Sequence, residues 1–346
     1  MKITKHLAMC ASVMALGACS GGGNSAGNLA GTPAVTTPAI PSVTLGPITS
    51  IQAPATPLLA NGTTPSFSTQ LIPGTVFPLT QSVLVLTNNA VTDFNGGAGA
   101  TLTLVGVKNS DGTITSTGAG TSVYQLSVPG LSLGSDVQLP SDGSRINLSN
   151  GGSAAAFVSA LSYTHFGTWL YTPGGSGPAY QGFQVSGYQT SVGAVPASGS
   201  ATYAGNGTSG GGAVTGFVFV PDGSGSIAFA SLLGKASVNV NFSSGVVSGS
   251  LTGITSTTGS GSTPVAWNDV SLTGNLSGAT LSGNTAVGGS AAGSGGFTLS
   301  TAATGKFSGA LYGPNGQELG AVWTLNEPNS VNGKTATGTI AAIKGP

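Results

Sequence analysis

Charged side chains are scarce in this sequence. Its 346 residues include 8 Lys+Arg and 8 Asp+Glu, and the formal net charge at pH 7 is zero. Proteins that bind nucleic acid use clusters of basic residues to neutralise phosphates. The sequence contains no such cluster, so we exclude nucleic acid as a partner.

Cysteine and histidine are also rare, with two of each. A zinc site needs about three or four His, Cys, Asp or Glu ligands. Hydrolysis by paired carboxylates needs two acidic side chains about 5 to 9 Å apart. The acidic residues here are scattered, and Asp111, Asp142 and Asp222 each precede glycine in a predicted turn. We therefore expect no catalytic residues, no metal site and no cofactor, and we expect that the protein is not an enzyme.

The first residues have the three regions of a secretory signal peptide. Lys2 and Lys5 precede an apolar run, residues 7–16, that is too short to span a bilayer, which needs about 20 residues. The run ends in Leu16-Gly17-Ala18-Cys19, the pattern at which bacterial lipoprotein signals are cleaved. Residues 1–18 are predicted to be removed and Cys19 to carry the lipid anchor, and Ser20 after it favours the outer membrane. The alternative is an ordinary signal peptide that contains a cysteine by chance.

Cleavage leaves six basic and eight acidic residues and one cysteine, so no disulfide can form within the mature chain. Residues 19–78 are rich in Gly and Ser and then in Pro, Thr and Ala. Such a segment has little apolar surface to bury and is typical of a flexible tether. We expect it to hold a folded module away from the membrane.

The rest of the chain predicts many short strands. Val- and Leu-rich segments are separated by Gly, Asn and Ser, and the sequence has 59 glycines. The dipeptides Asp111-Gly112, Asp142-Gly143 and Asn150-Gly151 predict hairpin turns. Residues 153–161 fit either a short helix or a strand. After residue 196 further strands are predicted, and they are spaced as in an antiparallel barrel or sandwich; these are 213–220, 237–242, 245–254, 266–276, 296–300, 305–308, 318–325 and 334–343.

Two glycine motifs are better explained by composition than by chemistry. Residues 205–210 match the GxGxxG pattern of dinucleotide-binding proteins, but more glycine and a strand follow them instead of the helix that binds the pyrophosphate. Residues 207–211 match the GxSxG pattern of serine hydrolases. That chemistry needs a histidine base and an α/β sheet, and one histidine, His165, remains after cleavage.

The stretch before residue 190 concentrates aromatic rings, among them Tyr163, Trp169 and Tyr171, around His165. Alternate residues of a strand lie on one face, so the four side chains predict a shared surface. Packing in the protein core explains them, because Trp and Tyr bury large areas. In the alternative interpretation, they line a ligand site, with Tyr163 or His165 binding haem iron or a solute.

Three segments resemble the transferrin-binding protein B family. Gly199-Ser200-Ala201-Thr202-Tyr203-Ala204-Gly205 is similar to the Gly-x-Ala-x-Tyr-x-Gly opening strand of the family's barrel. Residues 307–321 resemble its Phe-x-Gly-x-Phe-Tyr-Gly-Pro-x-x-x-Glu-x-Gly-Gly hairpin, with Ala321 in place of the second glycine. Residues 163–169 resemble the aromatic Gly-x-Trp stretch before the barrel. The matching barrel residues, which we expect to be structural, are Tyr203, Gly205, Phe307, Tyr312, Gly313, Pro314, Glu318 and Gly320.

The resemblance spans about residues 160–345 and implies an all-β fold. It implies a handle-like antiparallel β domain at 79–195, followed by an eight-stranded antiparallel barrel at 196–346, with Tyr312 and Trp323 available to fill its core. The chain has one lobe where the family's best-known member has two.

It also implies a monomeric outer-membrane surface lipoprotein that binds iron, haem, another solute or a host protein, with an outer-membrane transporter or export partner. A structural or adhesive surface lipoprotein is the alternative. A transmembrane porin is disfavoured because the predicted strands are short and the end of the sequence lacks an aromatic residue.

Overall fold

The computed structural model describes residues 73–345, except for 88–89, 95–98, 116–119, 134–136, 176, 206–211, 222–225, 260, 289–295 and 329–332. The predicted signal peptide, the anchor Cys19 and most of the predicted tether lie outside the described residues. Residues 206–211, which carry most of the two glycine motifs, lie outside them as well.

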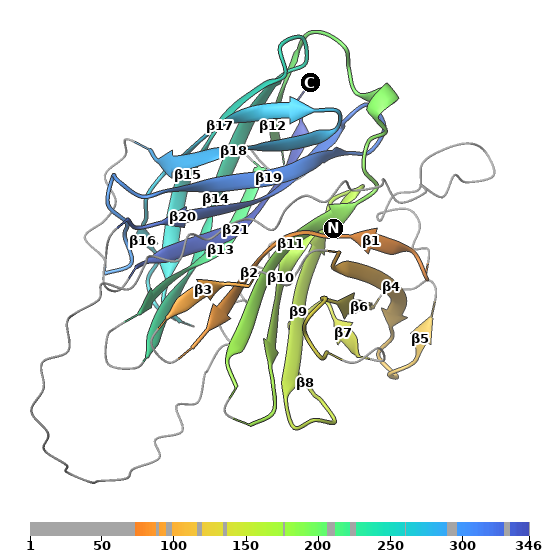
Figure 1. Ribbon diagram of the computed structural model, residues 1–346. Helices are drawn as coiled ribbons and strands as arrows, with labels where there is room; N and C mark the ends of the chain where they lie inside the picture. The colour runs from red at the N-terminus through yellow and green to blue at the C-terminus, as the bar shows by residue number, and fades with distance from the viewer. Residues whose placement is uncertain are drawn as a thin grey trace, which may run out of the picture.

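The described part of the chain is all-β, as predicted, with one turn of 3₁₀ helix, η3 (Val192–Ala194). Its first half forms two antiparallel sheets, which we call the handle (Figure 1). The strands of the first sheet are β1 (Val76–Pro78), β4 (Thr101–Lys108), β5 (Ile114–Thr115), β6 (Thr121–Ser127) and β7 (Gln138–Pro140). The strands of the second sheet are β2 (Thr80–Leu86), β3 (Val91–Asp93), β8 (Ile146–Asn147), β9 (Ser153–Ala160), β10 (Thr164–Thr172) and β11 (Ala179–Gly187).

The two handle sheets bury their facing sides against each other. In β4 the residues Leu102 and Leu104 are buried while Thr101 and Thr103, which alternate with them, are less so; this is the period-two pattern of a strand with one face in a core. Tyr124 of β6 and Trp169 of β10 belong to the same apolar cluster. The handle therefore has a hydrophobic core of its own.

The second half of the described chain is a closed barrel. Eight strands pair in the order β14-β13-β21-β20-β19-β18-β17-β15, and β15 pairs with β14 to close the circle. Two further strands, β12 and β16, extend it at its ends. The bounds are β12 (Ser200–Gly205), β13 (Gly212–Pro221), β14 (Ile227–Asn241), β15 (Val246–Thr257), β16 (Val265–Ala266), β17 (Val270–Ser277), β18 (Thr280–Val287), β19 (Thr304–Tyr312), β20 (Glu318–Asn326) and β21 (Thr335–Lys344).

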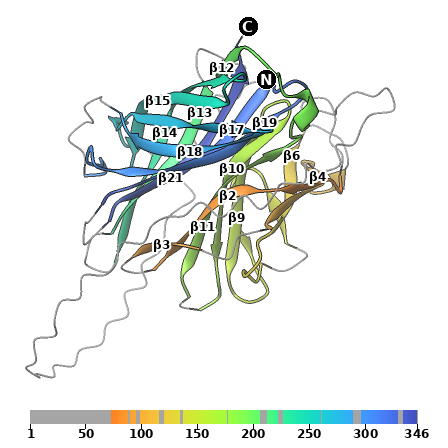
Figure 2. The same cartoon turned by 45° about the horizontal axis from the view of Figure 1, so that its top comes forward.

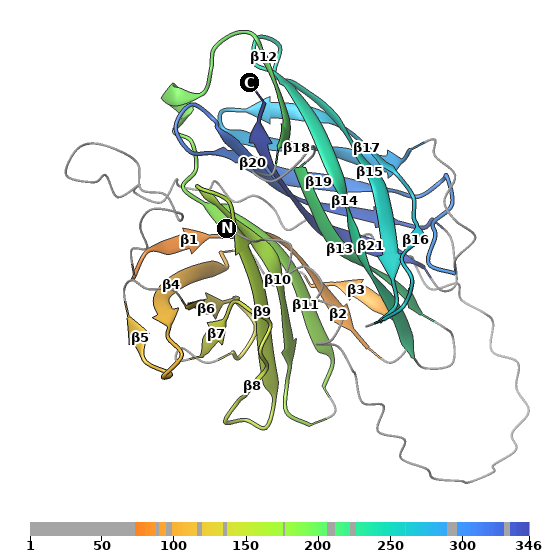
Figure 3. The same cartoon turned by 180° about the vertical axis from the view of Figure 1, so that it is seen from behind.

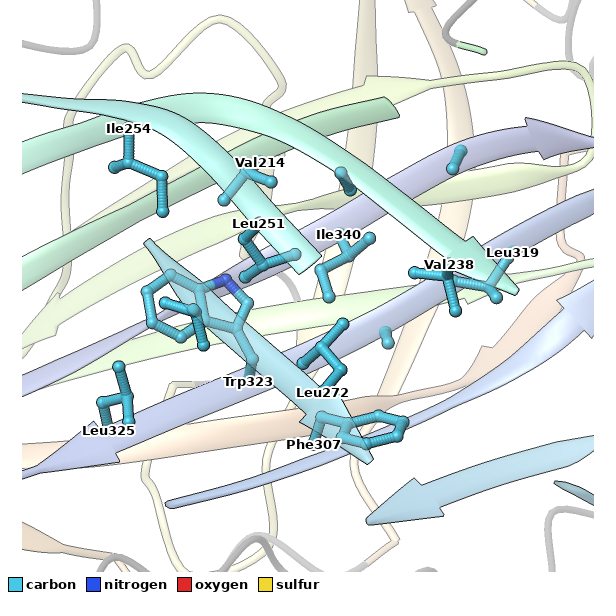
Figure 4. Close-up of a cluster of buried hydrophobic side chains, with 14 of the residues drawn as sticks. Val214, Val238, Leu251, Ile254, Leu272, Phe307, Leu319, Trp323, Leu325 and Ile340 are labelled. Atoms are coloured by element: carbon cyan, nitrogen blue, oxygen red, sulfur yellow. The ribbon is translucent and has the colours of Figure 1, made fainter. Parts of the chain in front are cut away.

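Side chains fill the interior of the barrel. Along β14 the inward-facing Val238 and Val240 are buried, whereas Ser237 and Asn239 are exposed. Apolar side chains from all eight strands meet inside in one cluster, and Figure 4 shows Trp323 and Phe307 among its aliphatic members. The barrel is thus a packed core, as expected for eight strands.

The handle packs against the outside of the barrel. Strands β2, β10 and β11 lie against β20 and β21, as Figures 2 and 3 show from two sides. A third apolar cluster lies between them and includes Phe183 of the handle with Phe217, Phe219 and Val322 of the barrel. The two parts are therefore joined by a buried interface as well as by the chain around η3.

Several predictions about local structure were wrong in detail. The tether does not extend to residue 78, because β1 begins at Val76 and buries Phe77 in the handle core. Residues 296–300 form no strand. Asp142-Gly143 is not a hairpin turn, since it connects β7 and β8, which belong to different sheets. In each of the three predicted turn dipeptides, the glycine has a positive φ and the Asp or Asn before it does not. Residues 153–161 form the strand β9 and not a helix.

Candidate functional site: the junction of handle and barrel

A buried carboxylate joins the handle to the barrel. Glu318, the first residue of β20, is 2% exposed. Its Oε1 accepts a hydrogen bond from the backbone N–H of Ser162 at 2.8 Å. Its Oε2 accepts one from the backbone N–H of Tyr163 at 2.9 Å and one from the hydroxyl of Thr164 at 2.8 Å. All three donors belong to the handle, so one barrel side chain fixes the start of β10.

Two opposing effects act on the Glu318 carboxyl. Burial disfavours its charged form and raises the pKa, while the hydrogen bonds from residues 162–164 stabilise the charge and lower it. Burial is the larger effect, and the pKa of Glu318 lies above its ordinary value. The three donors therefore offset only part of the desolvation cost of the charged carboxylate.

The turn before Glu318 requires its glycines. Gly313, Asn315 and Gly316 have φ values of 76°, 56° and 65°, in the left-handed region that glycine and asparagine tolerate best. A Cβ atom on Gly313 would lie 2.5 Å from Cδ2 of Tyr163. The ring of Tyr163 therefore packs directly on the backbone of this turn, and only glycine leaves it room.

The chain that connects the handle to η3 also bonds to this hairpin. Thr190 donates its N–H to the carbonyl of Leu311 at 2.9 Å and its hydroxyl to the carbonyl of Gly313 at 2.7 Å. The N–H of Gly313 in turn donates to the carbonyl of Tyr188 at 2.8 Å. The hairpin between β19 and β20 is thus held from two sides by the handle.

Other residues of the family motif meet at the same end of the barrel. Tyr203 of β12 is fully buried and donates its hydroxyl to the carbonyl of Gly316 at 2.7 Å. A Cβ atom on Gly320 would lie 2.8 Å from Cγ2 of Thr164, so this glycine also lets the handle approach. Pro314 is half-buried in the turn. The structure therefore brings most of the motif to one junction.

Two motif residues act within the barrel itself. Gly205 follows a break in register between β12 and β21. Phe307 is inside the barrel, where a Cβ atom on Gly283 would lie 2.6 Å from its ring.

The prediction that Tyr312 fills the barrel core was wrong, because Tyr312 belongs to no barrel cluster and lies on the outer side beside Gly320. Trp323 does fill the core.

His165 lies in the core of the handle. It is 1% exposed, its Nε2 lies 3.0 Å from the hydroxyl oxygen of Tyr124, and its ring meets those of Tyr124 and Phe77 edge-on. Burial lowers its pKa to about 3, so the imidazole is neutral at physiological pH. A ligand could reach this nitrogen only after the core opened.

The other three aromatic candidates are also packing residues in this structure. Trp169 is 1% exposed and its indole covers Gly182, where a Cβ atom would lie 2.0 Å from Cε2. Tyr171 is buried, with its hydroxyl 3.2 Å from the carbonyl of Ser132. Tyr163 precedes β10 and packs on the hairpin turn. His165, Trp169 and Tyr171 share one face of β10, as alternation predicts, and a ligand role for the four stays a prediction.

We expect Trp169→Ala to lower the free energy of unfolding by about 3–5 kcal/mol, because the change leaves a cavity between the two handle sheets. Urea unfolding monitored by circular dichroism measures this loss. Tyr171→Phe is the control, since it removes only a hydroxyl and should cost less than about 1.5 kcal/mol. Similar losses for the two variants would contradict a core role for Trp169.

The handle residues that bond to Glu318 and to its hairpin were not predicted from the sequence. Ser162, Thr164 and Thr190 carry neither an aromatic ring nor a titratable group, so nothing in their chemistry marked them. Their position could have indicated Ser162 and Thr164, since these residues flank Tyr163 in the stretch that resembles the family.

In the ranges that the structure describes, no group of three or more His, Cys, Asp or Glu residues could hold a metal ion. Within the same ranges, no helix is long and apolar enough to cross a membrane.

Residues 195–344 match the family described as the C-lobe and N-lobe beta barrels of Tf-binding protein B. The barrel of this chain is therefore similar to the barrels of transferrin-binding protein B, as the resemblance implied. No curated protein matches the chain.

Solved structures similar to this chain include three transferrin-binding proteins B. A tryptophan-to-alanine variant from Haemophilus parasuis Hp5 has 16% identity and a TM-score of 0.41, and the match covers 78% of this chain and 45% of that one. Intact Ap-TbpB, with its N and C lobes, has 18% identity and a TM-score of 0.39, with 77% and 46% covered. The isotype 1 protein from serogroup B Neisseria meningitidis has 16% identity and a TM-score of 0.35, with 77% and 43% covered. The match spans less than half the length of each.

Proposed function

We propose that this chain is a non-catalytic binding protein on the bacterial outer-membrane surface, anchored through a lipid on Cys19. The observation that carries the proposal is the match of residues 195–344 to the barrels of Tf-binding protein B. The signal sequence before Cys19 and the polar tether after it support the anchoring. The partner class is a host protein, with transferrin as the first candidate, and iron or haem is the cargo.

The two ends of the barrel differ in a way that suits binding at one of them. Because neighbouring strands are antiparallel, the connections alternate between the ends. One end, which we call the narrow end, carries the short connections 242–245, 278–279 and 313–317 and is held by the handle. The other, which we call the wide end, carries the short connection 222–226 and the longer connections 258–269, 288–303 and 327–334. Long loops on a rigid scaffold are where binding surfaces usually form, so we place the partner there.

Two exposed valines allow a matched test. Val265 is 44% exposed at the wide end and Val246 is 50% exposed at the narrow end. We expect immobilised full-length protein to bind iron-loaded human transferrin, and Val265→Lys to weaken binding about ten-fold, since a lysine at a packed interface costs on the order of 1–2 kcal/mol. Val246→Lys should leave the affinity unchanged. Biolayer interferometry measures both.

Failure to bind iron-loaded or iron-free transferrin would rule out this partner. Haem, titrated in the same series, tests the cargo directly. If iron-loaded transferrin, iron-free transferrin and haem all fail to bind, the result favours the alternative, a structural or adhesive surface lipoprotein. Loss of binding in Val246→Lys alone would place the partner at the narrow end.

A further inference from the structure

Residues 296–303 close the wide end of the barrel, and we call this segment the lid. Leu299 is 5% exposed and Ala303 is fully buried, and both belong to the cluster inside the barrel. Phe297 packs against the same cluster. The lid thus fills the mouth of the barrel with its own apolar side chains.

The lid is held mainly by side chains of its neighbours. Asn268 binds it twice, with its Nδ2 donating to the carbonyl of Leu299 at 2.9 Å and its Oδ1 accepting the N–H of Leu299 at 2.8 Å. The indole N–H of Trp267 donates to the carbonyl of Phe297 at 2.9 Å.

At its edges, Glu327 accepts the N–H of Ser300 at 3.0 Å, and the Nζ of Lys334 donates to the carbonyl of Thr298 at 2.8 Å. No barrel strand pairs with residues 296–302 in the structure as described. Residues 296–302 can therefore move without breaking the ladders of the barrel, while Ala303 stays bonded to the N–H of Val287 at 3.3 Å.

Beneath the lid lies a hydrogen-bond donor that has no partner. The rings of Trp267 and Trp323 are 6.3 Å apart, so Trp267 connects the lid to Trp323. Trp323 is fully buried, and its Nε1 has no acceptor among the described residues. Figure 4 shows its indole nitrogen among aliphatic side chains such as Leu251.

Buried N–H groups in proteins are nearly always paired. An ordered water needs two to four polar partners, and the aliphatic members of the cluster near Trp323, such as Leu251, carry no polar side-chain atom. A single acceptor atom on an otherwise apolar molecule suits this position better than water does.

We propose that the wide end of the barrel is a binding site for a small, uncharged, apolar molecule with one hydrogen-bond acceptor. The molecule takes the place of the lid's side chains against Trp267, and its acceptor atom receives the N–H of Trp323. The apolar side chains of the cluster favour an uncharged molecule. The site lies at the same end of the barrel as the surface proposed for a protein partner, and a different probe tests each of them.

The test uses full-length protein, with β-ionone, a neutral apolar ketone, and the matching hydrocarbon without the carbonyl. We expect β-ionone to quench tryptophan fluorescence saturably and to bind about five-fold more tightly than the hydrocarbon, as one neutral hydrogen bond provides. Trp323→Phe should remove this preference. Asn268→Ala should strengthen the binding of both probes, because it loosens the lid.

A preference for the ketone that survives in Trp323→Phe would overturn the proposal, as would the absence of saturable quenching in both wild type and Asn268→Ala. A second measurement needs no variant. Hydrogen exchange at the amide of Leu299 should become faster when β-ionone saturates the protein, because the lid is displaced. Unchanged exchange at saturation would refute the site even if Trp323→Phe failed to fold.

Discussion

Replacement of Glu318 by alanine is expected to destabilise the protein by about 3–5 kcal/mol, because three donors at the junction lose the acceptor that they share. The change leaves the N–H groups of Ser162 and Tyr163 and the hydroxyl of Thr164 without their acceptor in a buried junction. Each unsatisfied buried group costs about 1–3 kcal/mol. Chemical denaturation of wild type and variant measures the difference.

Glu327 provides the matched control at the other end of the same strand. Its carboxylate also accepts a backbone N–H, that of Ser300, but it is half-buried. Glu327→Ala should cost less than about 1.5 kcal/mol, because its partner remains open to water. If Glu318→Ala and Glu327→Ala lower the free energy of unfolding equally, the buried carboxylate of Glu318 stabilises the junction no more than a half-buried one would.

Acidification is expected to destabilise the protein through His165. The pKa of this buried imidazole is lowered to about 3, whereas an unfolded chain has a histidine pKa of about 6.5. Between these values the unfolded state binds the proton and the folded state does not. The free energy of unfolding therefore falls by about 1.4 kcal/mol for each pH unit below about 6.5. At pH 7 the full contribution is present.

The comparison of wild type with His165→Gln isolates this effect, since glutamine does not titrate and can still bond to Tyr124. The difference in stability between the two proteins should change by about 2–3 kcal/mol from pH 6.5 to pH 4.5. Glu318 acts in the opposite sense, because its raised pKa makes the folded state hold its proton more strongly as the pH falls. Measuring both proteins in a Glu318→Gln background removes that contribution. A pH-independent difference would mean that His165 is accessible to protons in the folded protein.

The period-two pattern of apolar residues predicted most of the barrel, and it worked best where strands have one face in the core. Val238 and Val240 alternate with Ser237 and Asn239, and the structure buries the valines. The pattern failed at residues 296–300, because Phe297 and Leu299 alternate in a segment that fills the mouth of the barrel without pairing to a strand. It also missed β18, where Gly283 and Asn284 conceal the alternation.

The junction between handle and barrel was less accessible from sequence. The motif around Gly313 and Glu318 was recognised, but its purpose was not, since nothing local indicates that Glu318 receives donors about 155 residues earlier in the chain. Alternation correctly placed His165, Trp169 and Tyr171 on one face of a strand. Whether that face meets a core or a ligand depends on the opposite sheet, and the sequence of β10 contains no information about it.

The position of β21 also governs how the barrel can assemble. This strand lies between β13 and β20, and it pairs with β13 across a sequence distance of more than 100 residues. Until β21 arrives, β13 and β20 each present a row of unpaired backbone groups, which readily join to the edges of other chains. Closure must therefore wait for the synthesis of β21, and contacts so distant in sequence form slowly. We expect the chain to depend on chaperones that cover these two edges until the barrel closes.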